Sequence, residues 1–165
     1  MPKIVFDADA LIKLARAGIL PQVTGAFDCH ATRVVEREAV DAGKAKMYED
    51  ALRIEDEIGR GRIRVHAISA PKTEESGELG TGELTALSLF AKIGADAIAS
   101  DDRKFLSKLE RDGIPFVTPT QLLVALWKSG KISRKSAARG LEGLRHFVPE
   151  HSYKNALNQI GGIEQ

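Results

Sequence analysis

Two short apolar segments of this 165-residue chain are each followed at once by acidic residues. The segments are KIVFD (3–7), which leads into Asp7 and Asp9, and DAIAS (96–100), which leads into Asp101 and Asp102. Short runs of apolar and β-branched residues predict buried strands. In an open parallel sheet, functional groups collect where strand turns into helix. We therefore expect carboxylates from two separate strands to meet at one edge of a sheet.

Two glutamates stand where they can lean toward the same edge. Glu38 lies in the first turns of a predicted helix in the segment RVVEREAV, and Glu83 lies in the first turn of the helix in GTGELTALSLFAK. Like charges that lie close repel unless cations neutralise them, and oxygen-only ligands select hard ions such as Mg²⁺ or Mn²⁺. Such an ion activates water and stabilises charge on a phosphoryl group, and two ions clamp the attacking and leaving oxygens.

Each of these acids also has an ordinary structural interpretation. Aspartates after strands can cap helices or favour the positive end of a helix dipole, and Glu83 stands at the offset of a capping box. Glu38 and its neighbour Glu36 can be exposed helix residues. The convergence of all these acids on one edge favours the metal-site interpretation over separate caps.

Charge and composition narrow the function classes. The chain has 24 Lys and Arg against 23 Asp and Glu, so its net charge of +1 does not by itself indicate a nucleic-acid binder. Residues 128–145 nevertheless hold six basic residues and one acid, Glu142. This basic segment predicts either a flank that holds a polyanion or a solvated helix face.

Several other classes find no support in the sequence. The four histidines show no zinc-type spacing, and no phosphate-binding loop is present. The single cysteine, Cys29, excludes an internal disulfide and favours a reducing compartment. We see no signal peptide and no apolar run of roughly 18 residues, which a membrane helix would need. We therefore expect a cytoplasmic protein without a membrane anchor.

The elements that must position the acids alternate along the chain. Strands are predicted at 3–7, 28–33, 62–68, 96–100 and 114–118, with helices between them, a loop at 69–80, and two last helices at 133–146 and 150–161. This alternation predicts an α/β fold with a mainly parallel sheet of about five strands and helices on both faces, a three-layer α/β/α sandwich. We expect one domain over 1–165, with a core at about 1–130 and a helical C-terminal extension at about 131–165.

Four local patterns together resemble the PIN-domain family of metal-dependent ribonucleases. They are VFDADALIKLARAG, RVVEREAV, GTGELTALSLFAK and IASDDRKF, and the resemblance runs from about residue 3 to residue 130. The tail after them is similar to the helical end of a PIN subgroup found in archaea and bacteria. None of the four patterns is specific alone, but their order and spacing along one α/β chain carry the resemblance.

The resemblance implies a metal site and an activity. Asp7, Glu38, Glu83 and either Asp101 or Asp102 would hold one or two Mg²⁺ or Mn²⁺ ions, and Glu36 is the alternative to Glu38. Ser100 would orient a carboxylate or a bound water, which makes it part of the catalytic set. Arg103 either touches the phosphate or sits on a helix surface. Three further basic residues are candidates for following an RNA backbone: Lys131, Arg134 and Lys135.

The expected function is hydrolysis of RNA phosphodiester bonds as the toxin of a toxin–antitoxin pair. By the same resemblance, an antitoxin segment would cover the acidic edge, and the protein would form a homodimer through the apolar faces of helices 8–18 and 119–130. One alternative is a non-catalytic RNA-binding or interaction module that uses the basic C-terminal helices. A third is a phosphatase or a DNA flap nuclease with a related metal centre.

Overall fold

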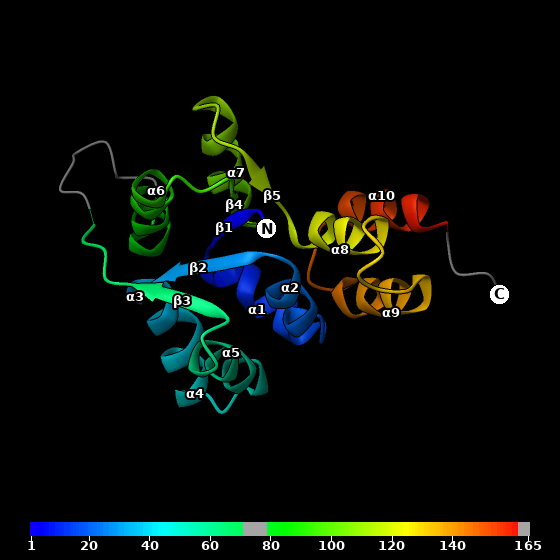
Figure 1. Ribbon diagram of the computed structural model, residues 1–165, viewed down its shortest axis with the longest axis horizontal. Helices are drawn as coiled ribbons and strands as arrows, with labels where there is room; N and C mark the ends of the chain where they lie inside the picture. The colour runs from blue at the N-terminus through cyan, green and yellow to red at the C-terminus, as the bar shows by residue number, and fades with distance from the viewer. Residues whose placement is uncertain (71–78, 162–165) are drawn as a thin grey trace.

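A five-stranded parallel sheet forms the centre of the computed structural model, which describes residues 1–70 and 79–161 (Figure 1). The strands are β1 (Lys3–Phe6), β2 (Asp28–Thr32), β3 (Ile63–His66), β4 (Ala97–Ala99) and β5 (Phe116–Val117), in the spatial order β3-β2-β1-β4-β5. All four strand pairs are parallel. β1 therefore lies between β2 and β4, although about 90 residues separate it from β4 in the sequence.

Helices cover both faces of the sheet, as predicted. On one face pack α6 (Thr81–Ile93) and α7 (Arg103–Arg111), in an apolar cluster with Val5 and Ile98. The other face carries α1 (Ala8–Arg16), α2 (Leu20–Ala26) and α5 (Glu49–Gly59), whose apolar residues join Ile4 and Phe6 in the larger core. The result is the three-layer α/β/α architecture expected from the alternation (Figure 1).

The segment between β2 and α5 contains a break. It runs through α3 (Arg33–Glu36), a π-helical turn η1 (Arg37–Asp41) and α4 (Ala42–Ala45). Among the residues described, Met47 is the one non-glycine residue with a positive φ, at 61°. This left-handed residue ends the first helical stretch, so that α5 restarts at Glu49. π-helical turns are frequent at functional sites, and this one carries Glu38.

Three C-terminal helices extend the larger core. They are α8 (Pro119–Lys128), α9 (Arg134–Leu144) and α10 (Glu150–Ile160), which pack on one another at one end of the sheet (Figure 1). Their buried residues belong to the same apolar cluster as Ile4 and Phe6. Gly140 of α9 makes this approach close, because a Cβ there would lie 2.7 Å from Ile19 Cγ2.

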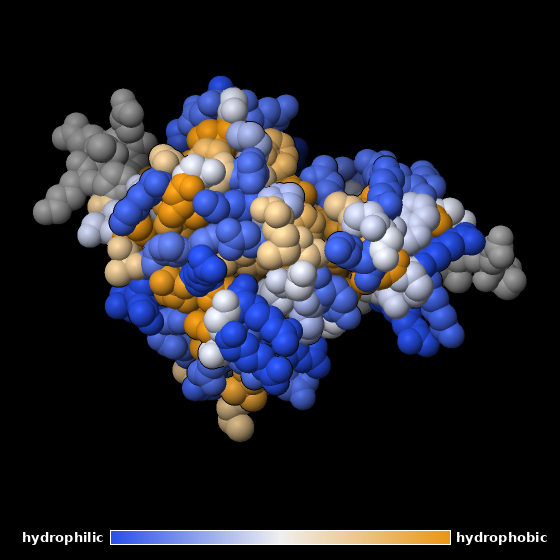
Figure 2. Space-filling model, in the orientation of Figure 1, coloured by the Kyte–Doolittle hydropathy of each residue, from blue (hydrophilic) through white to orange (hydrophobic). Residues whose placement is uncertain are grey.

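The surface visible in Figure 2 is mainly hydrophilic, as expected when the apolar residues form the core. Over α5, the face shown in Figure 2 is strongly hydrophilic, and hydrophobic residues appear on it as small patches. No helix in the part of the chain that the structure describes is both long and apolar enough to cross a membrane. Most of the loop predicted at 69–80 lies outside the described residues.

Candidate functional site

Asp7 lies at the end of the central strand and begins the helix that follows. Its backbone N–H donates to the carbonyl of Ala99 on β4, 3.1 Å away, which fixes the strand end against its neighbour. The side chain caps α1, because Oδ1 accepts from the backbone N–H of Ala10 at 2.8 Å. The other carboxylate oxygen accepts a short hydrogen bond from the Ser100 hydroxyl. Asp7 is thus both a helix cap and part of the acidic edge.

The Asp7 carboxyl is buried with other acids nearby. Only 4% of the residue is exposed. Burial raises its pKa from 3.8 to about 7; the hydrogen bonds from Ser100 and Ala10 work against this rise, while the charges of Asp9 and Glu83 add to it. A carboxylate in this position gains from a cation, since a positive charge would favour its ionised form.

Ser100 connects the two strand ends. It is fully buried, and its hydroxyl oxygen also accepts from the backbone N–H of Asp102 at 3.1 Å. Asp102 caps α7, with Oδ1 accepting from the N–H of Phe105 at 2.9 Å. One serine therefore holds the Asp7 carboxylate and the backbone that carries Asp102 in fixed relation.

Glu38 and Glu83 meet at the beginning of α6. The Glu38 carboxylate accepts from the backbone N–H of Gly82. The contact is so close that a Cβ on Gly82 would lie 2.6 Å from Glu38 Oε2. The Glu83 carboxylate accepts from the N–H of Gly80. Gly80 is the N-cap of α6, so Thr81 is its first residue and Glu83 bonds back to the cap as in a capping box.

The direction of the pKa shifts indicates that these acids lie near enough to affect one another. Burial raises the pKa of Glu83, and the charges of Asp102 and Glu38 raise it further. Burial likewise raises the pKa of Glu38. Glu83 also raises the pKa of Asp7. The fold therefore brings Asp7, Glu38, Glu83 and Asp102 into one electrostatic neighbourhood, from four different segments of the chain.

Glu36 and Asp101, the alternatives to Glu38 and Asp102 in the sequence, each form an ion pair with a basic residue. Glu36 forms an ion pair with Arg33, with 2.6 Å between Glu36 Oε1 and Arg33 Nη1. Asp101 pairs with Lys13 at 2.7 Å, and the same Lys13 ammonium lies 3.1 Å from Asp9. The Asp101 side chain is only 3% exposed. Burial raises its pKa, and Lys13 opposes that rise.

Comparison with known proteins identifies the family. A family model described as a PIN domain matches residues 3–162. The chain belongs to the PIN-domain family. PIN domains are generally nucleases and typically use divalent metals. The match includes α9 and α10, so it extends past residue 130, where the resemblance seen in the sequence ends. No curated protein and no solved structure matches the chain.

The PIN-domain acids suit a divalent ion in type and charge. Their donors are carboxylate oxygens, which Mg²⁺ and Mn²⁺ prefer, and the pKa values of Asp7, Glu38 and Glu83 are all raised by burial. Within residues 1–70 and 79–161, however, no three His, Cys, Asp or Glu side chains form a group that could hold one ion. An ion bound there would take one or two of these carboxylates directly and would keep several waters, as Mg²⁺ usually does.

Of the four basic residues proposed for RNA, Arg103 lies near the acids and Arg134 does not. Arg103 is the first residue of α7 and lines the same cavity as Asp101. Arg134 instead donates to the carbonyls of Ile160 and Gly161 at the C-terminal end of α10, at 3.0 and 2.9 Å. The helix of 11 residues spans about 15 Å. Arg134 is therefore a full helix length away from the end of α10 that faces Asp101, and Lys131 and Lys135 stand exposed beside it.

Lys13 is a residue of the site that was not predicted from the sequence. A signal was present, since Lys13 stands four residues after Asp9 on a predicted helix, the spacing of a helical ion pair. The pairing with Asp101 had no such signal, because the two residues are 88 positions apart in the sequence. Lys13 neutralises part of the charge of Asp9 and Asp101. Among the described residues, Asp7 and Asp102 therefore remain as the aspartates without an ion pair beside Glu38 and Glu83.

Proposed function

We propose that this PIN domain is an endoribonuclease that hydrolyses RNA phosphodiester bonds with Mg²⁺ or Mn²⁺ held by Asp7, Glu38, Glu83 and Asp102. The observation that carries the proposal is the buried Asp7 carboxylate, which faces other acids and is held by neutral donors, Ser100 and the Ala10 N–H. That environment is unfavourable for an isolated anion and favourable for one that binds a cation.

Each residue of the acidic edge has a role in this proposal. Asp7 is the central ligand, and Ser100 fixes which of its oxygens points away from the helix cap. Glu38 and Glu83 bring further negative charge from the other side of the edge. A divalent ion bound there would supply an activated water and would stabilise negative charge on the phosphate. Asp101 is proposed as a positioning residue, since Lys13 occupies its carboxylate.

The test is cleavage of a labelled single-stranded RNA in Mn²⁺, in Mg²⁺ and in EDTA. The wild type should cut only with metal, and Asp7→Asn should reduce cutting to the level seen in EDTA. Glu38→Gln and Glu36→Gln form a matched pair, because only the Glu38 carboxylate reaches the beginning of α6. Loss in the first variant and retention in the second are expected, and equal rates in wild type and Asp7→Asn would overturn the mechanism.

A non-catalytic RNA-binding module remains the second candidate. The observation that favours it is the lack, among the described residues, of three acids close enough to hold one ion. This reading requires that Mn²⁺ leave the melting temperature unchanged, whereas a bound metal must raise it. A third reading, a phosphatase or DNA flap nuclease, requires faster hydrolysis of small phosphate esters or DNA junctions than of RNA under the same conditions.

The cellular role stays a prediction. A toxin should arrest growth when it is expressed alone, and growth should return in the Asp7→Asn variant. An antitoxin that neutralises the acidic edge, a cytoplasmic location and a homodimer are expectations of the same kind. The apolar faces of α1 and α8 cannot supply the dimer contact, because Leu11, Leu14, Leu122, Leu123 and Leu126 are buried in the chain's own core. A homodimer would need other residues.

A further inference from the structure

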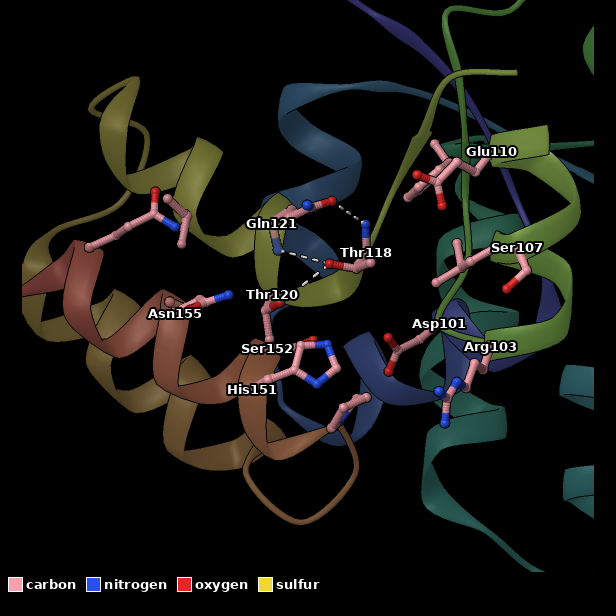
Figure 3. Close-up of a pocket in the computed structure, with 16 residues that line it drawn as sticks. Asp101, Arg103, Ser107, Glu110, Thr118, Thr120, Gln121, His151, Ser152 and Asn155 are labelled. Atoms are coloured by element: carbon pink, nitrogen blue, oxygen red, sulfur yellow. Dashed lines mark hydrogen bonds between the residues drawn. The ribbon is translucent and has the colours of Figure 1, made fainter. Parts of the chain in front are cut away.

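A cavity opens beside the acidic edge, between α7, α8 and α10. Its volume is about 670 Å³, within the range of about 300 to 1,000 Å³ that holds small organic ligands. Asp101 lies at one end of it, directly before the proposed ligand Asp102 (Figure 3). Nothing in the proposed metal chemistry uses this cavity. Its position next to the acids makes it the nearest hollow that a substrate could enter.

The cavity combines an apolar lining with polar side chains at its edges. Leu106, Phe116, Val124 and Ala156 contribute apolar surface. Hydroxyl and amide groups from α7, α8 and α10 point toward the same space (Figure 3). A nucleobase has this character, with apolar faces and hydrogen-bonding edges, and proteins recognise single-stranded RNA by stacking on the faces and bonding to the edges.

Of the three amides that line the cavity, Asn155 is the one with neither its oxygen nor its nitrogen bonded within the described residues. Gln121 is engaged, because its Oε1 accepts from the Thr118 N–H at 3.0 Å in the capping box of α8. Gln159 is engaged too, since its Oε1 accepts from Lys128 at 3.0 Å. Asn155 of α10 has no hydrogen-bond partner within the described part of the chain, and its side chain extends into the cavity (Figure 3).

Basic groups stand where a phosphate would pass from the cavity to the acids. Arg103 begins α7 and His151 lies in the first turn of α10, and both line the cavity on either side of Asp101 (Figure 3). Lys13 already compensates the charge of Asp101. Glu110 lines the cavity from the C-terminal half of α7, on the side away from His151. A nucleotide could therefore lie with its phosphate toward Arg103 and His151 and its base toward Asn155.

We propose that this cavity, between α7, α8 and α10, takes one nucleotide of single-stranded RNA next to the scissile phosphate, with Asn155 contacting the edge of its base. The inference rests on the proposed function, which it deepens by naming a subsite for the substrate. It also assigns the C-terminal helices a role, because α10 supplies both His151 and Asn155. The nuclease would then prefer particular bases at one position beside the cut.

The experiment measures binding without cutting. Fluorescently labelled RNA 12-mers, each with one base fixed at a central position, are titrated with the full-length protein in EDTA. Asn155→Leu removes the amide at nearly constant size, and Asn158→Leu makes the same change on the same helix at a residue outside the cavity. Both asparagines are exposed, so neither change should disturb folding. Melting temperatures measured alongside will verify this.

The two variants should behave differently. Asn155→Leu should weaken binding of the preferred 12-mer about tenfold and level the differences between bases, since good side-chain pairing with a base edge is worth about that much or more. Asn158→Leu should bind as the wild type does. Equal binding by both variants, or no RNA binding by the wild type in EDTA, would overturn the inference. The proposed nuclease activity is judged separately, because a failure to cut with Mn²⁺ leaves these affinities unchanged.

Discussion

Substitution of Gly82 by alanine should separate the stability of this PIN domain from its activity. A Cβ at residue 82 would lie 2.6 Å from Glu38 Oε2 and 2.9 Å from Oε1, whereas ordinary contact begins at 3.4 Å. The nearer oxygen must therefore retreat by at least 3.4 − 2.6 = 0.8 Å. That movement also weakens the hydrogen bond from the Gly82 N–H to Glu38. A misplacement of about 1 Å in a catalytic site can cost about a hundredfold in rate.

The free energy of unfolding should change little in the same variant. Alanine is favoured over glycine within a helix by about 0.5 to 1 kcal/mol, and the lost hydrogen bond costs about 1 kcal/mol. Glu38 is exposed as a whole residue, although the beginning of α6 partly covers its carboxyl group, so the side chain can rotate into solvent without disturbing the core. The sum lies within about 1 kcal/mol of zero, which corresponds to a melting-temperature change of about 4 °C or less.

The assay compares Gly82→Ala with Gly80→Ala. A Cβ at residue 80 meets no atom within 4 Å, although alanine is a poorer N-cap than glycine. The control should therefore be slightly less stable and fully active, the reverse of Gly82→Ala. Chemical denaturation measures the free energy of unfolding. RNA cleavage and the Mn²⁺-induced rise in melting temperature measure whether the metal site is intact. If Gly82→Ala cuts RNA at the wild-type rate and Mn²⁺ raises its melting temperature as much as that of the wild type, then Glu38 does not depend on its contact with the beginning of α6.

Three further predictions concern charge and packing. Because burial raises the pKa of Asp7 from 3.8 to about 7, the folded protein keeps a proton that the unfolded chain loses between these values. In EDTA the wild type should therefore lose up to about 4 kcal/mol of stability as pH rises from about 4 to 7, and Asp7→Asn should not show this loss. Lys13→Met should destabilise the protein by about 3 kcal/mol, because Asp101 is left buried without its cation. Gly140→Ala should cost about 1 to 3 kcal/mol through its clash with Ile19.

Controls for these three come from the chain itself. The pH prediction is checked by measuring the free energy of unfolding of wild type and Asp7→Asn across the pH range. The same dependence on pH in both proteins would contradict it. The double variant with Lys13→Met and Asp101→Asn should recover most of the stability, and a simple sum of the two single effects would argue against the ion pair. Gly59→Ala, at a helical residue with open space, should not destabilise. A second unfolding transition in Gly140→Ala would contradict the prediction that residues 1–165 form one unit.

The fold could be predicted because its signals are local. Short apolar strands, helices with glycine at their ends and acids at strand–helix junctions all show within about 15 residues. Parallel connection then follows from the alternation itself. The boundaries of α3, η1 and α4 could not be predicted, since the left-handed Met47 and the π-helical turn depend on how the segment packs against α5.

The sequence could predict which residues are candidates for the site, but not how they are arranged or which partners they have. Asp101 and Asp102 are adjacent in the sequence, and only their partners distinguish them: Lys13 for Asp101 and the α7 cap for Asp102. The cap of α7 is a local contact, but the pairing of Asp101 with Lys13 comes from tertiary structure. The same is true of Arg134, whose charge suggested RNA while its guanidinium bonds to the end of α10. The ligand set and the RNA contacts stay predictions.

The place of β1 in the sheet has a consequence for how the protein is made. Asp7 is made long before its partners, because its N–H pairs with Ala99 and its carboxylate with Ser100, more than 90 positions later in the chain. At about 5 to 20 residues per second, Asp102 is made about 5 to 20 s after Asp7. The acidic edge therefore cannot exist on a nascent chain until β4 has been made and has reached β1. The cavity comes later still, because α10 follows β4 by about 50 residues in the chain. A growing chain that acts as we propose can therefore cut no RNA until Ser100 and Asp102 have been made and have reached Asp7.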